Sequence, residues 1–166
     1  MKLNIGCGEH RLEGYKGVDI TKTGAADIVA DINKPWKFAK DETVDEIYAS
    51  HIVEHVDSLI HFFNESHRVL KKGGILKVIA PYYTSVRCWQ DPTHKHAISE
   101  HSFLYYNKEW REMNGLSHYP ITADFDFGYA FQWHPNWVSR SDEARNWALV
   151  HYSNVVTDIH CTLTKR

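Results

Sequence analysis

The sequence predicts an α/β fold with a mostly parallel sheet and an antiparallel edge at its C-terminal end. In the first half, short apolar strands alternate with turns, and several end in an acidic or small residue. Buried parallel strands have this pattern where they reach a ligand crevice. The first half contains no hairpin turn signals, which favours right-handed crossovers between its strands. Near the end of the chain, residues 155–164 predict a closing antiparallel strand.

Five short apolar segments define the strands of the first half. We expect them at Leu3–Ile5, Gly17–Ile20, Asp27–Asp31, Asp45–Ala49 and Gly74–Pro81. The clearest helix precedes the last of them, with Asp57 as N-cap and Lys71–Gly74 as its close. Only Glu9 to Lys16 separate the first glycine turn from the second strand, so a helix there has a turn or two at most.

The second half is rich in aromatic residues and histidines, and residues 82–120 predict loops. A short helix is expected near Asn107–Met113, a strand from Ile121 to Phe131 and a helix at 143–152. We therefore predict one domain over residues 1–166. Residues 1–81 form a cofactor-binding half, and residues 82–166 supply acceptor-side loops and closing strands.

Composition agrees with one folded domain. The chain has 166 residues, and a net charge of −2 gives no general affinity for nucleic acid or an anionic membrane. Three widely spaced cysteines suit a reducing compartment better than a disulfide framework, so the expected location is cytoplasmic.

The strongest local signal is Gly6-x-Gly8 directly after the first strand. Glycine there lets the backbone approach a bound nucleoside, although a plain turn is the alternative. Asp19 ends the second strand and is placed to accept hydrogen bonds from a ribose diol. Asp31, at the end of the third strand, can reach the adenine edge. Strand-end caps are the other interpretation of both aspartates.

A dinucleotide site would need a third glycine where Arg11 stands, together with a fuller helix for the pyrophosphate. The Gly-x-x-x-x-Gly-Lys-Ser/Thr phosphate loop is also missing. The predicted ligand is therefore a nucleoside without a phosphate chain.

These motifs together resemble the small class I S-adenosylmethionine-dependent methyltransferases. The resemblance is dense over residues 2–81, continues through 91–96 and fades after about residue 110. It is carried by the segments 3–8, 14–20, 30–32, 45–55 and 65–74. The fold it implies is a Rossmann-like class I methyltransferase sheet with shortened crossover helices.

The resemblance also implies S-adenosyl-L-methionine as the cofactor. Gly6 and Gly8 would pack against its methionine part, Asp19 would hold the ribose, and Asp31 with Ile32 would flank the adenine. The full expected cofactor set is Asn4, Gly6, Cys7, Gly8, Asp19, Ile20, Asp31, Ile32, Ser50 and His51. Asn4 departs from the family, whose members often have an acidic residue before the glycine loop. Residues 82–140 are expected to cover the acceptor.

Two histidine patterns allow a metal as an alternative. His51-x-x-Glu54-His55 matches an inverted zinc-protease motif, which needs both histidines well inside a helix. Asp91, His94, His96 and His101 form a second candidate set, although hydrogen-bonded loop histidines would look the same. The preferred interpretation has no metal, with Asp91, His94 and His96 as catalytic residues. In it Asp91 orients His94 as a general base.

The predicted function is methyl transfer to a small-molecule acceptor that the sequence does not identify. The protein would chiefly align the methyl donor with the acceptor. A non-catalytic S-adenosylmethionine-binding protein or subunit is the main alternative, and a zinc-dependent hydrolase is a further one.

Overall fold

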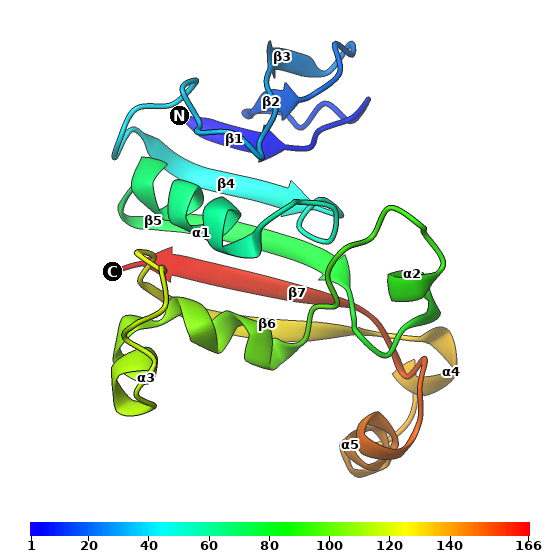
Figure 1. Ribbon diagram of the computed structural model, residues 1–166. Coiled ribbons are helices and arrows are strands. Elements are labelled where there is room, and N and C mark those ends of the chain that lie inside the picture. Colours follow the sequence, from blue (N-terminus) through cyan, green and yellow to red (C-terminus); the bar gives the residue numbers. More distant parts are fainter.

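The computed structural model describes residues 1–166, and its centre is one seven-stranded sheet (Figure 1). The strands lie in the order β3-β2-β1-β4-β5-β7-β6. Their bounds are β1 Lys2–Ile5, β2 Lys16–Asp19, β3 Ala26–Val29, β4 Val44–Ser50, β5 Leu70–Pro81, β6 Phe125–Trp133 and β7 Val156–Lys165. The pairs among β1 to β5 are parallel, and β7 is antiparallel to both β5 and β6. The predicted fold class is confirmed.

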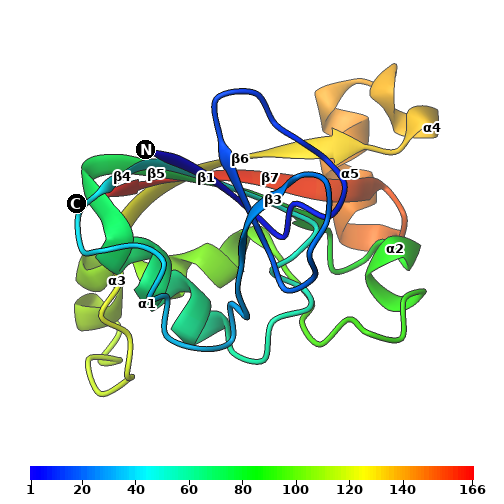
Figure 2. The same cartoon turned by 90° about the horizontal axis from the view of Figure 1, so that it is seen from above.

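The crossover connections contain even less helix than the shortened crossover helices that the sequence predicts. The chain between β1 and β2 forms turns and no helix, and the next two connections are also without helices. Only the β4–β5 crossover contains one, α1 (Leu59–Val69). Figure 2 shows α1 on the same side of the sheet as α3 (Lys108–Met113).

Helix α1 begins one residue later than the sequence suggested. Its N-cap is Ser58, whose hydroxyl accepts the backbone amide of His61. Asp57 instead forms an ion pair with Lys95. The helix ends at Val69 and the chain enters β5 directly, so Gly73 and Gly74 belong to the strand rather than to the helix end.

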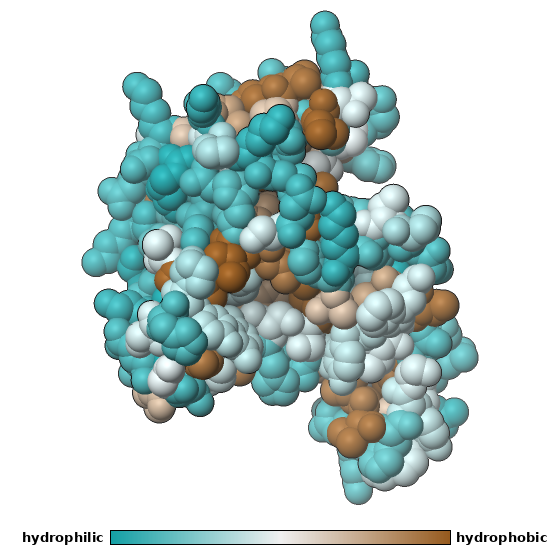
Figure 3. Space-filling view, in the orientation of Figure 1, coloured by the Kyte–Doolittle hydropathy of each residue, from teal (hydrophilic) through white to brown (hydrophobic).

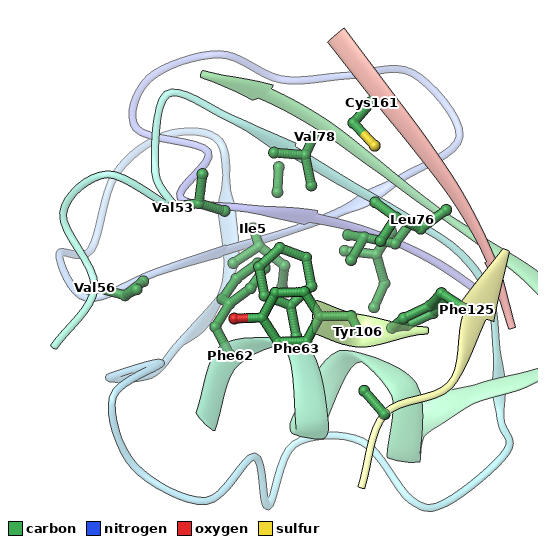
Figure 4. Packing of buried hydrophobic residues seen from close by; sticks show 14 of the residues in the cluster. Ile5, Val53, Val56, Phe62, Phe63, Leu76, Val78, Tyr106, Phe125 and Cys161 are labelled. Atoms are coloured by element: carbon green, nitrogen blue, oxygen red, sulfur yellow. The ribbon is translucent and has the colours of Figure 1, made fainter. Parts of the chain in front are cut away.

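Aromatic side chains fill the space between α1 and the sheet (Figure 4). Phe62 and Phe63 of α1 are buried, and the Phe63 ring stacks on Tyr106 at 3.9 Å between ring centroids. Ile5, Leu76 and Val78 belong to the same cluster from the sheet side. This packing fixes the strands whose carboxyl ends carry the candidate site.

The second half contains more helix than predicted. It adds α2 (Val86–Trp89), a 3₁₀ helix η1 (Glu100–Tyr106) and α4 (Pro135–Val138) to the expected α3 and α5 (Asp142–His151). Strand β6 starts later than predicted because the buried Arg111 guanidinium donates to the carbonyls of Ile121 and Ala123. None of the helices combines the length and apolar character that crossing a membrane requires.

Candidate functional site

Two clefts meet at the glycine turn after β1. The first encloses about 280 Å³ and the second about 410 Å³, and both are lined by Gly6 and Gly8. They lie where β1, β2 and β4 reach their carboxyl ends, the usual ligand position on an open parallel sheet. The space-filling surface is hollowed on that side of the molecule (Figure 3).

The turn requires glycine for two different reasons. Gly6 has a φ of +67°, and a Cβ there would lie 2.6 Å from Cγ1 of Ile52. Gly8 has a φ of +51°, but a Cβ there would meet nothing within 4 Å. The first glycine therefore permits close packing inside the protein, whereas the second faces space that a ligand can occupy.

The Asp19 carboxylate is fixed by the backbone around it. Oδ2 accepts the amide of Gly8 at 2.8 Å, and Oδ1 accepts the amide of Thr21 at 2.9 Å. Each carboxylate oxygen has a further lone pair. Asp19 can therefore accept two more hydrogen bonds, as a vicinal diol in the first cleft would offer.

The far end of the first cleft is formed by the turn after β3. Asp31 Oδ1 accepts the amide of Asn33 at 3.0 Å. This bond and the nearby Lys34 ammonium lower the pKa of Asp31 below its usual range, so the carboxylate is ionised near neutral pH. Ile32 and Ile52 add apolar lining between these polar groups, which suits a flat heterocycle with a polar edge.

The second cleft is lined by polar side chains from β1 and β4. Asn4 is buried, and its amide nitrogen donates to the carbonyl of His10, which ties the glycine loop to the strand. An acidic side chain at this position could not make that bond. Cys7 lies beside Asn4 with its thiol pKa raised, first by burial and then by the charge of Asp19. It is thus a neutral lining group and no nucleophile at neutral pH.

His51 follows β4 in a conformation rare for residues other than glycine, with a φ of +53°. Its amide donates to the carbonyl of Ile79, which holds the turn against β5. The ring lies between two buried carboxylates, with Nδ1 3.4 Å from Glu54 Oε1 and Nε2 3.9 Å from Asp158 Oδ1. Arg87 pairs with the other Asp158 oxygen at 2.7 Å. Backbone strain of this kind is concentrated at functional sites.

The predicted catalytic segment lies against the same turn, but its hydrogen bonds differ from the expected ones. His94 Nδ1 is 2.9 Å from the carbonyl of Cys88, and its Nε2 is 3.9 Å from Asp91, beyond hydrogen-bonding distance. Asp91 instead accepts the amide and hydroxyl of Thr93, and these bonds lower the pKa of Asp91. His96 Nε2 contacts the carbonyl of Val56 at 2.8 Å.

The zinc-protease interpretation of His51-x-x-Glu54-His55 is wrong in its geometry. These residues lie in the turns between β4 and α1, and the helix begins only at Leu59. The two histidines therefore do not share a helix face. His101 is mostly exposed and stands apart from His94, so the second histidine set is not one cluster either.

The ten predicted cofactor residues all line one or both clefts. The first contains Gly6, Gly8, Asp19, Ile20, Asp31 and Ile32, and the second contains Asn4, Gly6, Cys7, Gly8, Ser50 and His51. Sequence reasoning missed seven lining residues, which are His10, Ala30, Asn33, Tyr48, Ile52, His55 and Val56. Ala30, Asn33 and Ile52 directly adjoin a predicted residue, so their position at the end of a strand was the signal that could have found them.

Comparisons with known proteins agree with this geometry. Residues 9–78 match the model of the methyltransferase domain family. A SAM-dependent methyltransferase from Archaeoglobus fulgidus is 20% identical, with a TM-score of 0.68 over 99% of this chain and 85% of that chain. One from Mesorhizobium loti is 14% identical, with a TM-score of 0.59 over 99% and 90%. One from Methanosarcina mazei is 13% identical, with a TM-score of 0.57 over 99% and 91%. No curated protein sequence matches the chain.

Proposed function

We propose that this chain is a class I S-adenosylmethionine-dependent methyltransferase and that it methylates a small-molecule acceptor at the junction of its two clefts. The observation that carries the proposal is the meeting of both clefts at Gly6 and Gly8. The first cleft has the groups that a nucleoside needs, and the second leads from the same turn along β4.

The residues present fit S-adenosylmethionine. Asp19 holds spare acceptor positions for the ribose hydroxyls, and the apolar side chains of Ile32 and Ile52 suit the adenine faces. Gly8 leaves open space at the turn for the methionine part. When bound, the cofactor supplies an activated methyl group, so the chain's task is to position the acceptor and exclude water.

We assign the acceptor side to the segment 91–96 together with His51. His94 is held by the Cys88 carbonyl through Nδ1, which leaves Nε2 as the free atom of its ring. That atom can take a proton from a hydroxyl acceptor directly, or it can bind a cation that lowers the pKa of the acceptor. His96 anchors the segment through its contact with the Val56 carbonyl, and Asp91 positions Thr93.

Transfer of a labelled methyl group tests the proposal. The purified protein would be incubated with methyl-labelled S-adenosylmethionine and, separately, with the small-molecule and macromolecular fractions of a cell extract. We expect label to enter the small-molecule fraction, and Asp19→Ala to abolish this transfer. Cofactor binding without label transfer to either fraction would favour the non-catalytic alternative, and transfer to macromolecules alone would overturn the small-molecule acceptor.

A further inference from the structure

Three side chains from the two candidate metal patterns meet in one place. Glu54, His55 and His94 each offer one ligand atom, and these atoms all lie within 4.8 Å of one another. Glu54 and His55 belong to the turns after β4, whereas His94 follows α2. We propose that this trio binds one divalent transition-metal ion of the zinc type.

The Glu54 carboxylate needs a positive partner, and no lysine, arginine or hydrogen-bond donor of the protein supplies one. The residue is 1% exposed, and neither carboxylate oxygen has a hydrogen-bond donor. His51 Nδ1 lies 3.4 Å from Oε1, at ion-pair distance but without making a hydrogen bond. Buried carboxylates are costly unless they are paired, hydrogen-bonded or bound to metal. This unpartnered group therefore points to a cation between it and the two histidines.

The hydrogen bonds of His94 leave its Nε2 free as a ligand. Nδ1 lies 2.9 Å from the Cys88 carbonyl, which can only accept, so Nδ1 carries the proton. In the neutral ring Nε2 then has the lone pair. Metal-binding histidines characteristically use one nitrogen for the metal and donate from the other to a carbonyl or carboxylate.

His55 is oriented in the same way through Thr93. The Thr93 hydroxyl donates to Asp91 Oδ1 at 2.7 Å, so its single proton is already used. His55 Nδ1, 3.0 Å from that hydroxyl oxygen, must therefore be the donor of their contact. Its Nε2 is also left with a lone pair. The chain Asp91–Thr93–His55 thus supplies the outer support that a metal-bound imidazole requires.

The donor set indicates the class of metal. Two imidazoles and one carboxylate are the protein ligands of many catalytic zinc sites, which keep a fourth position open. Imidazole ligands favour zinc and its transition-metal neighbours over magnesium or calcium. With bonds of roughly 2.0–2.1 Å, ligand atoms around zinc lie about 3.4 Å apart, so small side-chain rotations would close the site.

His55 also lines the first cleft, so an ion held here would lie beside the cofactor and near the acceptor segment. The role of His94 is then to coordinate the ion rather than to take a proton itself. Metal binding does not depend on methyl transfer, and the two can be tested apart.

The test is a zinc titration of the chelator-treated protein, followed by calorimetry and by the visible absorption of a cobalt(II) substitute. We expect one equivalent of zinc to bind, with a rise in melting temperature, and cobalt to give the intense bands of a low-coordinate site. Glu54→Gln and His94→Ala should each weaken zinc binding at least about 10-fold. Loss of a residue that merely hydrogen-bonds to a metal ligand already lowers metal affinity by about 10–100-fold. The matched control His101→Ala removes an exposed histidine outside the trio and should bind zinc like the wild type.

Zinc binding that is absent, or unchanged in both Glu54→Gln and His94→Ala, would overturn the site. The metal-free proteins give a second readout that does not need bound metal. Glu54→Gln replaces an unpartnered buried charge, so its metal-free melting temperature should equal or exceed that of the metal-free wild type. A clearly lower value would show that a protonated histidine already pairs with Glu54, and would also overturn the proposal. Binding of S-adenosylhomocysteine to the chelator-treated protein tests the proposed function separately.

Discussion

The backbone amide of Gly8 donates a 2.8 Å hydrogen bond to Oδ2 of Asp19. This bond joins the turn after β1 to the end of β2, so the open space at Gly8 and the Asp19 carboxylate keep a fixed relation. It replaces part of the support that a crossover helix between these strands would give. The Asn4 contact with the His10 carbonyl ties down the same loop from the other strand.

Asp19→Ala should weaken the binding of S-adenosylhomocysteine by about 2–4 kcal/mol, because two ribose hydroxyls lose a charged acceptor. Isothermal titration calorimetry measures the change. Asp142→Asn, which alters an exposed carboxylate on α5, is the control and should bind as the wild type does. Unchanged affinity in Asp19→Ala would remove Asp19 from the site.

Gly6→Ala should destabilise the fold by about 1–3 kcal/mol, since alanine resists the positive φ and its Cβ would overlap Ile52. Urea unfolding measures the loss. Gly115→Ala is the matched control because Gly115 has a φ of +71° with nothing within 4 Å of its Cβ. Equal losses in the two variants would show that the contact with Ile52 has no energetic weight.

His94→Ala should lower methyl transfer strongly while the affinity for S-adenosylhomocysteine stays within about threefold, or roughly 0.6 kcal/mol. The reason is position, because His94 does not line the first cleft, where the nucleoside would bind, and instead packs against His55 of that cleft with 4.6 Å between ring centroids. Calorimetry and the labelled-methyl assay give the two quantities, with His101→Ala as the control. A parallel fall in cofactor affinity and turnover would contradict the acceptor-side assignment.

The ion pairs of Glu46 predict how the free energy of unfolding depends on pH. Lys2 Nζ lies 2.7 Å from its Oε2, and Lys77 Nζ lies 2.5 Å from its Oε1. Burial raises the pKa of Glu46, but its close contacts with the two lysine ammonium groups outweigh this effect and lower the pKa to about 2. The folded pKa is below the unfolded value of 4.5, so the stabilisation is present above pH 4.5 and disappears as the pH falls toward 2.

We expect the wild type to lose about 1–3 kcal/mol more than Glu46→Gln across that interval, because the glutamine has no charge to lose. Urea midpoints measured from pH 6 to pH 2 give the comparison. Parallel profiles for the two proteins would mean that the ion pairs of Glu46 with Lys2 and Lys77 contribute nothing to the pH dependence of stability.

Most of the fold could be predicted because parallel strands and α1 have strong local patterns. The errors arose where long-range contacts override such patterns. Asp57 is a good N-cap by type, but Lys95 binds its carboxylate, and Ser58 takes the cap. The start of β6 was misplaced because Arg111 binds the carbonyls of residues that would otherwise extend the strand.

The candidate site likewise contains residues that local sequence patterns indicate and residues that only long-range contacts bring together. The predicted residues that line the clefts follow the ends of strands, so the strand pattern itself indicated them. The trio of Glu54, His55 and His94 could not be predicted, since it combines halves of two separate motifs that only the folded chain brings together. The free Nε2 atoms of both histidines are likewise set by hydrogen bonds to Cys88 and Thr93, which no sequence pattern encodes.

The most direct test of the central claim is a melting curve with S-adenosylhomocysteine. A ligand at one hundred times its dissociation constant adds about 2.7 kcal/mol to the free energy of unfolding. For a chain of this size the melting temperature should rise by roughly 5–10 °C. We predict this rise with S-adenosylhomocysteine or S-adenosylmethionine and almost none with NAD or ATP. An unchanged melting temperature with saturating S-adenosylhomocysteine, or an equal rise with NAD, would contradict the account.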